Sequence, residues 1–350
     1  NSVGSTLLGA ILQRKTGQNV QEFLTAELYP YIGIQPEDVA WLRLRDGIEI
    51  GGSGAFLRTE DMLKLLKLYL DGGVCAGRRI LSEAYVRQAT TRQNDNADLR
   101  QNPNACRRDW RAGYGYQMWM CSYPGAYRAD GAMGQFAIAI PSQDMVIVYT
   151  ETSRLGDGAQ GSLGLIWDFC EKAFVEPGTA PAEQEVRLRN RLSRLSLPAV
   201  PCQPRGNREQ LAGAWKVTQG SLYLDPCLGG IMDAYYSRRL VEGFRLRFGE
   251  YEAELSYELD GVPVRLAVGL DGNPRQNTIP CGGIPASQLL VSGSFAAPDT
   301  LSLVFRFVET CFCFQLELKV QGDSLFLRKD FLRGQVKDDH LQMQAQRVTN

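Results

Sequence analysis

The first half of the chain carries apolar residues at both helical and strand-like spacing. Gly17 ends the first helical stretch, and glycines 72–73 end the stretch that includes 62–70. We predict that Thr59 caps this second stretch, with Glu60 and Asp61 in its first turn, where the helix dipole favours acids. The predicted helices cover 7–15, 20–28, 62–70 and 163–174, and the predicted strands cover 136–140 and 145–149. This half therefore mixes helices with strands.

Beyond residue 206 the apolar residues alternate with polar ones, as they do on strands that have one buried face. Phe312, Phe314, Leu316 and Leu318 are predicted to face inward together, and similar runs recur at intervals of about ten residues. This pattern predicts a meander that forms a small barrel or a curved sheet, opened by Trp215. A side-chain-filled interior is expected, with an internal ligand cavity as the alternative.

The segment 177–205 separates these two halves and carries five prolines and the basic stretch RLRNRLSRL. Such a composition is typical of a linker that contains a short helix. Its arginines indicate either a solvated helix face or contact with an anionic partner. The expected organisation is α+β, with domains at 1–176 and 206–350 joined by this linker.

Composition narrows the possible partners. The 38 basic and 39 acidic side chains of the 350 residues nearly cancel, which argues against a nucleic-acid partner. The sequence has no run of about 18 apolar residues, so no membrane span is predicted. The nine cysteines are spread along the chain without a CxxC pair. Reduced thiols in a reducing compartment, the cytoplasm, are therefore expected.

Most familiar catalytic motifs are missing from the sequence. Its single histidine, His340, lies in a polar stretch (KDDH) that we expect to be a solvated tail, and no zinc-type spacing, GxSxG or Walker motif occurs. Neither a metal nor another cofactor is expected. A serine enzyme whose base is lysine or tyrosine remains compatible with the sequence, because it needs no histidine.

An ordered series of motifs over about residues 1–175 resembles the serine β-lactamase-like family. The motifs are NSVGSTLLGAILQRKTG, LYPYIGI, GGSGAFLRTEDMLKLLKLYLDGG, GYGYQMW and YRADGAMGQFAIAIPSQDMVIVYT. This family includes class C β-lactamases, DD-peptidases, esterases and 6-aminohexanoate-dimer hydrolases. The resemblance implies a partial β-lactamase/transpeptidase-like domain with an antiparallel sheet and helices. The part after residue 206 resembles the lipocalin-like β domain that is appended to some members.

The family carries its chemistry on three motifs, and this sequence matches them only in part. No lysine follows a serine by three residues, so the S-x-x-K motif is absent. The Y-x-S motif places Ser2 third and Asn1 in the middle, with its tyrosine directly before residue 1. Ala129-Asp130-Gly131 stands where the family has K-T-G. The resemblance thus implies the C-terminal portion of a serine hydrolase, truncated before Asn1 and inactive by itself.

The site residues follow from the same match. It implies catalytic positions at Ser2, Asp130 and Gly131, and substrate-binding positions at Asn1, Tyr114, Trp119, Ala129 and Gly134. Structural alternatives stay open for each type of residue: helix capping for the serine, turn capping for the aspartate, backbone conformation for the glycines and core packing for the aromatic residues.

The function implied is hydrolysis of a small-molecule ester, amide or peptide substrate through an acyl-enzyme, with backbone amides holding the oxyanion. Because A-D-G lacks the cation of K-T-G and adds an acid, neutral or cationic substrates are favoured over penicillins. The alternative is a non-catalytic ligand- or peptide-binding protein on the same fold, with the barrel as its recognition module.

Overall fold

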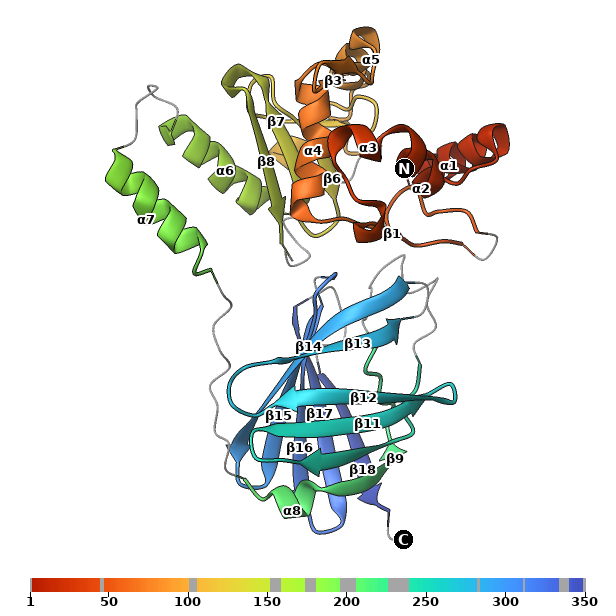
Figure 1. Cartoon of the computed structure of the whole chain (residues 1–350), viewed down its shortest axis with the longest axis vertical. Coiled ribbons are helices and arrows are strands. Elements are labelled where there is room, and N and C mark those ends of the chain that lie inside the picture. Colours follow the sequence, from red (N-terminus) through yellow and green to blue (C-terminus); the bar gives the residue numbers. More distant parts are fainter. Residues whose placement is uncertain are drawn as a thin grey trace. The chain divides into compact units, whose positions relative to one another are not determined.

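The computed structural model shows two compact units, Asn1–Gly178 and Thr179–Asn350 (Figure 1). It describes residues 2–44, 47–100, 106–151, 159–173, 181–195, 206–225, 239–281, 284–310, 312–333 and 340–348. Across these ranges, every helix is too short or too polar to cross a membrane.

The centre of the first unit is an antiparallel sheet of four strands in the order β5-β6-β7-β8. The strands are β5 (Trp119–Met120), β6 (Tyr127–Gly131), β7 (Gln135–Ile140) and β8 (Met145–Thr150). Because side chains alternate along β7, Phe136 and Ile138 pack beside residues of α6 (Gln160–Ala173). The intervening alanines pack beside residues of α4 (Thr59–Leu70) on the other face. Each face of the sheet therefore has its own apolar cluster.

Three helices precede this sheet: α1 (Ser2–Thr16), α2 (Val20–Glu27) and α3 (Tyr29–Ile32). Gly17, at φ 76°, follows the end of α1 as predicted. Asn19 caps α2 together with Glu22, and the buried Glu49 accepts a 2.6 Å hydrogen bond from the first backbone N–H of that helix. The remaining elements of this unit are η1 (Pro36–Asp38), β1 (Ala40–Trp41), β2 (Ala55–Phe56), β3 (Val74–Cys75), β4 (Arg78–Arg79), α5 (Glu83–Ala89), η3 (Arg108–Trp110) and η4 (Pro141–Gln143).

The predicted cap of α4 is wrong by one residue. Thr59 is the first helical residue, and Arg58 occupies the N-cap position without a side-chain hydrogen bond to the helix backbone. The first turn is instead held by Asp61, which is fully buried and pairs with Arg58 at 3.1 Å and Lys64 at 2.8 Å. The prediction of acids in this turn is confirmed.

The second unit contains a ten-stranded sheet in the order β12-β11-β10-β9-β18-β17-β16-β15-β14-β13. It begins with the helices α7 (Ala182–Leu192) and α8 (Arg208–Leu211). The strands are β9 (Gly213–Gln219), β10 (Gly243–Phe248), β11 (Glu252–Leu259), β12 (Val262–Gly269), β13 (Arg275–Cys281), β14 (Ile284–Ala297), β15 (Thr300–Phe307), β16 (Cys313–Gln321), β17 (Ser324–Arg333) and β18 (His340–Arg347). The first and last strands pair with each other, and β12 also pairs with β14, so the sheet closes into a barrel.

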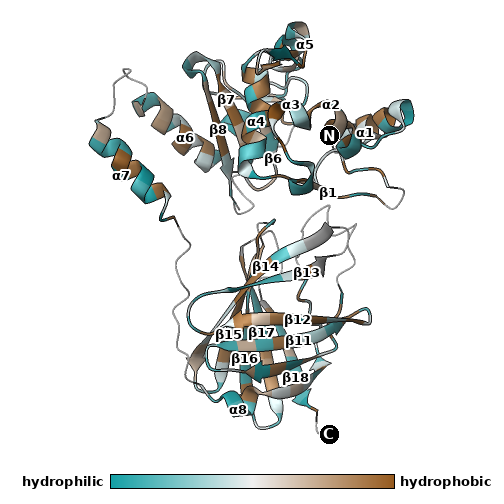
Figure 2. Ribbon diagram, viewed as in Figure 1, coloured by the Kyte–Doolittle hydropathy of each residue, from teal (hydrophilic) through white to brown (hydrophobic). Residues whose placement is uncertain are grey.

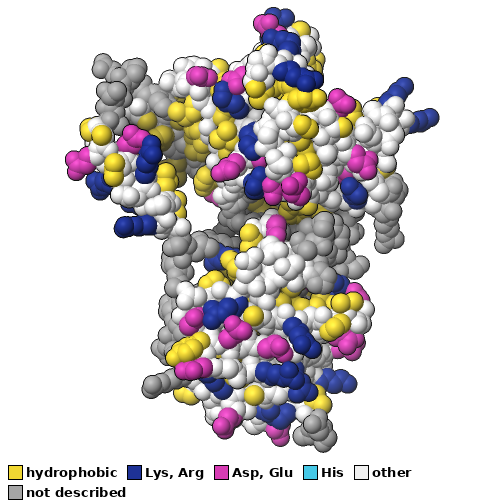
Figure 3. All heavy atoms as spheres, in the orientation of Figure 1, with side chains coloured by type: hydrophobic (Ala, Val, Ile, Leu, Met, Phe, Trp, Pro, Cys, Tyr) yellow, Lys and Arg dark blue, Asp and Glu magenta, His cyan; other side chains and the backbone are white. Residues whose placement is uncertain are grey.

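The apolar positions of the barrel strands form one buried face. Phe312, Phe314, Leu316 and Leu318 are at most 3% exposed, which confirms the predicted buried face. Figure 2 shows the corresponding alternation of hydrophobic and hydrophilic residues along the strands. On the visible outer face, positive and negative side chains are interspersed (Figure 3).

Trp215 connects the two ends of the meander. Its ring is buried, its indole N–H donates to the Leu211 carbonyl at 2.9 Å, and the guanidinium of Arg347 lies 4.4 Å from the ring centroid. His340, expected in a solvated tail, is instead the first residue of β18. The tail prediction is wrong because the alternation of Leu341, Met343 and Ala345 makes this segment the strand that pairs with β9.

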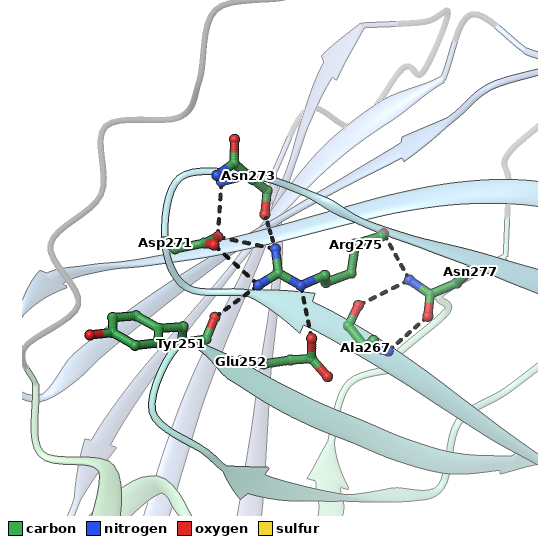
Figure 4. A network of polar contacts seen from close by, with 7 residues as sticks. All are labelled: Tyr251, Glu252, Ala267, Asp271, Asn273, Arg275 and Asn277. Carbon is green, nitrogen blue, oxygen red and sulfur yellow. Dashed lines mark hydrogen bonds and ion pairs between the residues drawn. The ribbon is translucent and has the colours of Figure 1, made fainter.

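Side chains replace strand pairing at the turn between β12 and β13 (Figure 4). The amide of Asn277 accepts from the Ala267 N–H at 2.7 Å and donates to the Ala267 carbonyl at 3.0 Å, as a neighbouring strand would. Arg275 binds Glu252 at 2.8 Å and Asp271 at 3.1 Å, and the hydrogen bond from Arg275 lowers the pKa of Asp271 to about 2. These contacts hold the barrel where its ladder is interrupted.

Candidate functional site

The candidate site lies in the first unit, beside a length of β6 that β5 does not cover. The short strand β5 pairs only with Tyr127 and Arg128. The following residues, 129–131, pair with β7 alone within the described part of the chain. Backbone groups along the other edge of 129–131 are therefore available to a ligand, in the way that any open strand edge offers donors and acceptors.

The two faces of this open segment differ in chemistry. Ala129 packs against the apolar cluster beside α4. Asp130 points the other way, toward Arg128, because residues two apart on a strand share a face. The carboxylate of Asp130 lies 2.9 Å from Nε of Arg128, and the side chains are 10% and 0% exposed. The acid is therefore held in an ion pair at the edge of the core.

Arg128 is held by several groups in addition to Asp130. Its Nη1 donates to the carbonyls of Asp109 at 3.1 Å and Met120 at 3.2 Å, and its guanidinium lies 4.7 Å from the ring centroid of Trp110. Its Nη2 is buried and has no hydrogen-bond partner among the described residues. Burial raises the pKa of Asp130, and the positive charge of Arg128 opposes that rise without cancelling it.

Asp109 is a second buried acid in the same network. Its oxygens accept hydrogen bonds from the backbone N–H of Ser122 at 2.7 Å, from Gln160 at 2.8 Å and from the indole of Trp167 at 3.2 Å. Burial opposes its ionisation, but these donors outweigh the effect and lower its pKa. Asp109 thereby joins η3 to α6.

Two aromatic residues lie next to this ion pair. The rings of Tyr114 and Trp119 meet edge to face with their centroids 4.9 Å apart. Burial, and then the negative charge of Asp130, raise the pKa of Tyr114. Trp119 pairs with Arg128 across β5 and β6, and the Arg128 guanidinium lies 5.7 Å from the centroid of the Trp119 ring. The tyrosine hydroxyl donates to Oε1 of Gln117 at 3.3 Å.

The start of α1 meets the GGSG segment and the Gln117 loop. Ser2 is the first residue of α1, and a Cβ on Gly52 would lie 2.4 Å from the Ser2 Cα, so only glycine permits this approach. The hydroxyl of Ser5 donates to Oε1 of Gln117 at 3.2 Å. Gln117 itself has φ 60°, a conformation that side chains rarely adopt and that is often found at functional sites.

Gly131 and Gly134 belong to the hairpin turn that joins β6 to β7. Gly134 has φ 93°, and a Cβ there would lie 2.4 Å from Cγ of Glu151. A Cβ on Gly131 would lie 2.9 Å from Cβ of Gln135. Both glycines are thus required by the turn and by close packing, whatever else they contact.

The structure connects most of the sequence-predicted site residues through this chain of contacts. Tyr114 and Trp119 meet each other next to the Arg128–Asp130 pair, while Ser2 contacts Gly52 at the start of α1. Ser2 and Asp130 share no contact that places them together. Asn1 lies outside the described residues.

Sequence reasoning missed four residues of this group: Ser5, Asp109, Gln117 and Arg128. Only Arg128 carried a usable signal, because a cation two residues before Asp130 on a predicted strand shares its face. Among the described residues, no group of three or more His, Cys, Asp or Glu side chains could hold a metal ion.

Comparisons with known proteins give only weak similarities. No protein-family model and no curated protein matches the chain. A structure titled as a 6-aminohexanoate-dimer hydrolase from Bacillus anthracis is 21% identical over 51% of this chain, with a TM-score of 0.43, and the match spans 45% of that hydrolase. A fatty acid binding protein from Schistosoma mansoni, in complex with arachidonic acid, is 9% identical over 41% of this chain and all of its own, with a TM-score of 0.30. A heat-soluble protein (SAHS) from Ramazzottius varieornatus is 11% identical over 43% of this chain and all of its own, also at 0.30. Similarities at this level carry no argument about function.

Proposed function

We propose that the first unit forms the substrate-binding and oxyanion side of a β-lactamase-like serine hydrolase that acts on an ester or amide through an acyl-enzyme. The observation that carries this proposal is the open edge of residues 129–131, with Tyr114 against Trp119 next to the Arg128–Asp130 pair and linked through Gln117 to α1. The ordered motifs of the sequence support the same assignment.

The open strand edge supplies the kind of group that acyl transfer needs. A backbone N–H in 129–131 would donate to the oxyanion of a tetrahedral intermediate, and a donor fixed by the sheet needs no reorganisation during the reaction. Because Arg128 neutralises Asp130 at 2.9 Å, this wall carries no net charge from the pair. We therefore expect neutral esters or amides to be preferred over anionic penicillins.

Ser2 takes the third position of the Y-x-S motif in this proposal. Ser2 begins α1, and the same helix contacts the Gln117 loop through Ser5, which supports a place for Ser2 near the substrate wall. The nucleophile is a different serine, because no lysine among the 350 residues follows a serine by three positions. Nucleophile and base must lie within hydrogen-bond reach of each other, so we expect this chain alone to be inactive.

The test compares this chain with one extended upstream in its own reading frame. We expect the extension to encode S-x-x-K and, directly before Asn1, a tyrosine. A fluorophosphonate probe should then label that serine in the longer chain and no serine in the 350-residue chain. An extension that encodes neither motif, or stoichiometric labelling of Ser2 in the shorter chain, contradicts the proposal.

A matched pair of tyrosines tests the substrate wall in the extended enzyme. Tyr114→Phe removes the hydroxyl that donates to Gln117, and we expect kcat/KM for a neutral p-nitrophenyl ester to fall about tenfold. Tyr116, two residues away and exposed, packs instead near Tyr85, so Tyr116→Phe should stay within about twofold. Equal effects of the two substitutions would contradict the assigned wall.

A second candidate is a non-catalytic ligand-binding protein, which is favoured by a hollow of about 440 Å³ on the outside of the barrel. An upstream sequence without S-x-x-K would leave this candidate as the better proposal.

A further inference from the structure

The barrel carries a hollow of about 440 Å³ on its outer face, within the size range of small-molecule sites. It spans β9, β16, β17 and β18, and its lining combines outward side chains with the buried Leu327 and Met343. The lining side chains include Glu317, Lys319, Phe326, Arg328, Gln342 and Gln344. This hollow is separate from the candidate site of the first unit, because every lining residue belongs to the barrel.

The strand register arranges these side chains in two rows. Lys319, Phe326 and Gln344 are opposite one another on adjacent strands, and Gln219 continues that row on β9. Gln219 points outward because a register shift between Gln344 and Ala345 changes the alternation of β9. Glu317, Arg328 and Gln342 form the second row in the same way. The ring of Phe326 therefore has Lys319 and Gln344 on the neighbouring strands and Arg328 two residues further along its own strand.

The charges in and around the hollow cancel. Lys319 and Arg328 are balanced by Glu317 in the hollow and by Asp330, which lies 2.7 Å from Nε of Arg328. Within the described residues, the side chains of Lys319, Gln342 and Gln344 make no hydrogen bond to the protein. Their donors and acceptors are thus available to a ligand without a net charge having to be matched.

We propose that this hollow binds a neutral, polyhydroxylated ring, a mono- or disaccharide. A hydroxyl both donates and accepts, as does the side-chain amide of glutamine, so a row of glutamines suits a ligand with several hydroxyls. Phe326, 38% exposed between these groups, offers an apolar surface for the C–H face of a sugar ring. Because Leu327 and Met343 are buried in the wall, Phe326 is the exposed apolar side chain of the lining, and this is too little apolar area to retain a lipid chain.

The experiment titrates the full chain with maltose, cellobiose and N-acetylglucosamine by isothermal calorimetry, with adenosine as a flat neutral ligand that offers an aromatic base. We expect saturable binding of at least one sugar. Phe326→Ala should weaken it about tenfold, whereas Leu332→Ala should leave it within about twofold. Leu332 is the matched control because it is on the same strand, is 43% exposed and does not line the hollow.

Gln344→Ala should also weaken sugar binding, because it removes an amide from the centre of the row. Absence of saturable sugar binding at millimolar concentration overturns the proposal. Equal effects of Phe326→Ala and Leu332→Ala overturn the location, and binding of adenosine alone overturns the class of ligand.

Discussion

The two units bury polar groups in different ways. The first unit buries charges within a side-chain network: Arg128 pairs with Asp130 and donates to the Asp109 carbonyl, while the Asp109 carboxylate is held by Ser122, Gln160 and Trp167. The barrel also pairs Arg239 with Asp225 at 2.8 Å, and in addition it buries the neutral amide of Asn277 where its ladder is interrupted and packs the Lys329 ammonium over the rings of Phe314 and Phe331.

This difference follows from what each unit has to hold together. Barrel strands satisfy one another's backbone groups, so polar side chains are needed mainly at the interruption between β12 and β13. The four-stranded sheet has an open edge at β6 and connects to η3 and α6 through side chains alone. We therefore infer that replacing a buried polar side chain lowers the free energy of unfolding more in the first unit than in the second.

The largest effect is expected from Arg128→Met. It leaves Asp130 as a buried carboxylate without its cation, and we expect the free energy of unfolding of the first unit to fall by about 3–5 kcal/mol. Arg247→Met is the control, because that arginine is 67% exposed and lies 3.5 Å from Glu254. Its cost should be below about 1 kcal/mol. Hydrogen exchange measured by mass spectrometry separates the two units, and equal losses would remove the contrast.

Asp109 should give the first unit a distinctive dependence on pH. Its pKa is lowered in the folded state, so its contribution is complete above the unfolded value of about 3.9 and is lost as the pH falls below that value. Asp109→Asn presents an amide to the donors of Gln160 and Trp167, and we expect a loss of about 2–4 kcal/mol at pH 7.

The measurement is urea unfolding of both proteins between pH 3 and 7. Asp130, whose raised pKa acts with the opposite sign, is present in both proteins, and the Asp109 charge is the smallest cause of that rise, so the difference between the curves reports mainly on Asp109. That difference should shrink toward acid pH. A difference that stays constant down to pH 3 would show that the Asp109 charge contributes nothing.

Asn277→Asp tests the barrel's use of a neutral amide. The carboxylate still accepts from the Ala267 N–H but faces the Ala267 carbonyl without a donor, so we expect a loss of about 1–3 kcal/mol. Asn273→Asp changes an exposed side chain in the same turn and should stay within about 0.5 kcal/mol. Thermal unfolding, monitored through peptides from the barrel, measures the stability loss of both variants. A loss for Asn277→Asp greater than that for Arg128→Met would reverse the comparison.

The sequence predicted the barrel better than it predicted the site, for a physical reason. The alternation of Phe314, Leu316 and Leu318 is a property of one strand and is visible locally. The burial of Arg128 depends on Trp110, Asp109 and Met120, which are distant along the chain, and arginine is normally exposed. Gln117 adopts its left-handed conformation without the glycine or asparagine that usually signals one.

The smallest effect is expected at the hairpin turns of the two units. Met133, between β6 and β7, has φ 68°, and Asp260, between β11 and β12, has φ 51°. An unbranched apolar side chain pays a steric cost in this region, whereas aspartate tolerates it through local hydrogen bonding. Met133→Gly should therefore relieve about 1 kcal/mol of backbone strain in the first unit, and the greater entropy of glycine in the unfolded chain offsets part of that gain. Asp260→Gly should leave the stability nearly unchanged. Paired urea titrations resolve the difference. If Met133→Gly is destabilising instead, the Met133 side chain contributes more to the packing of the turn than its backbone conformation costs.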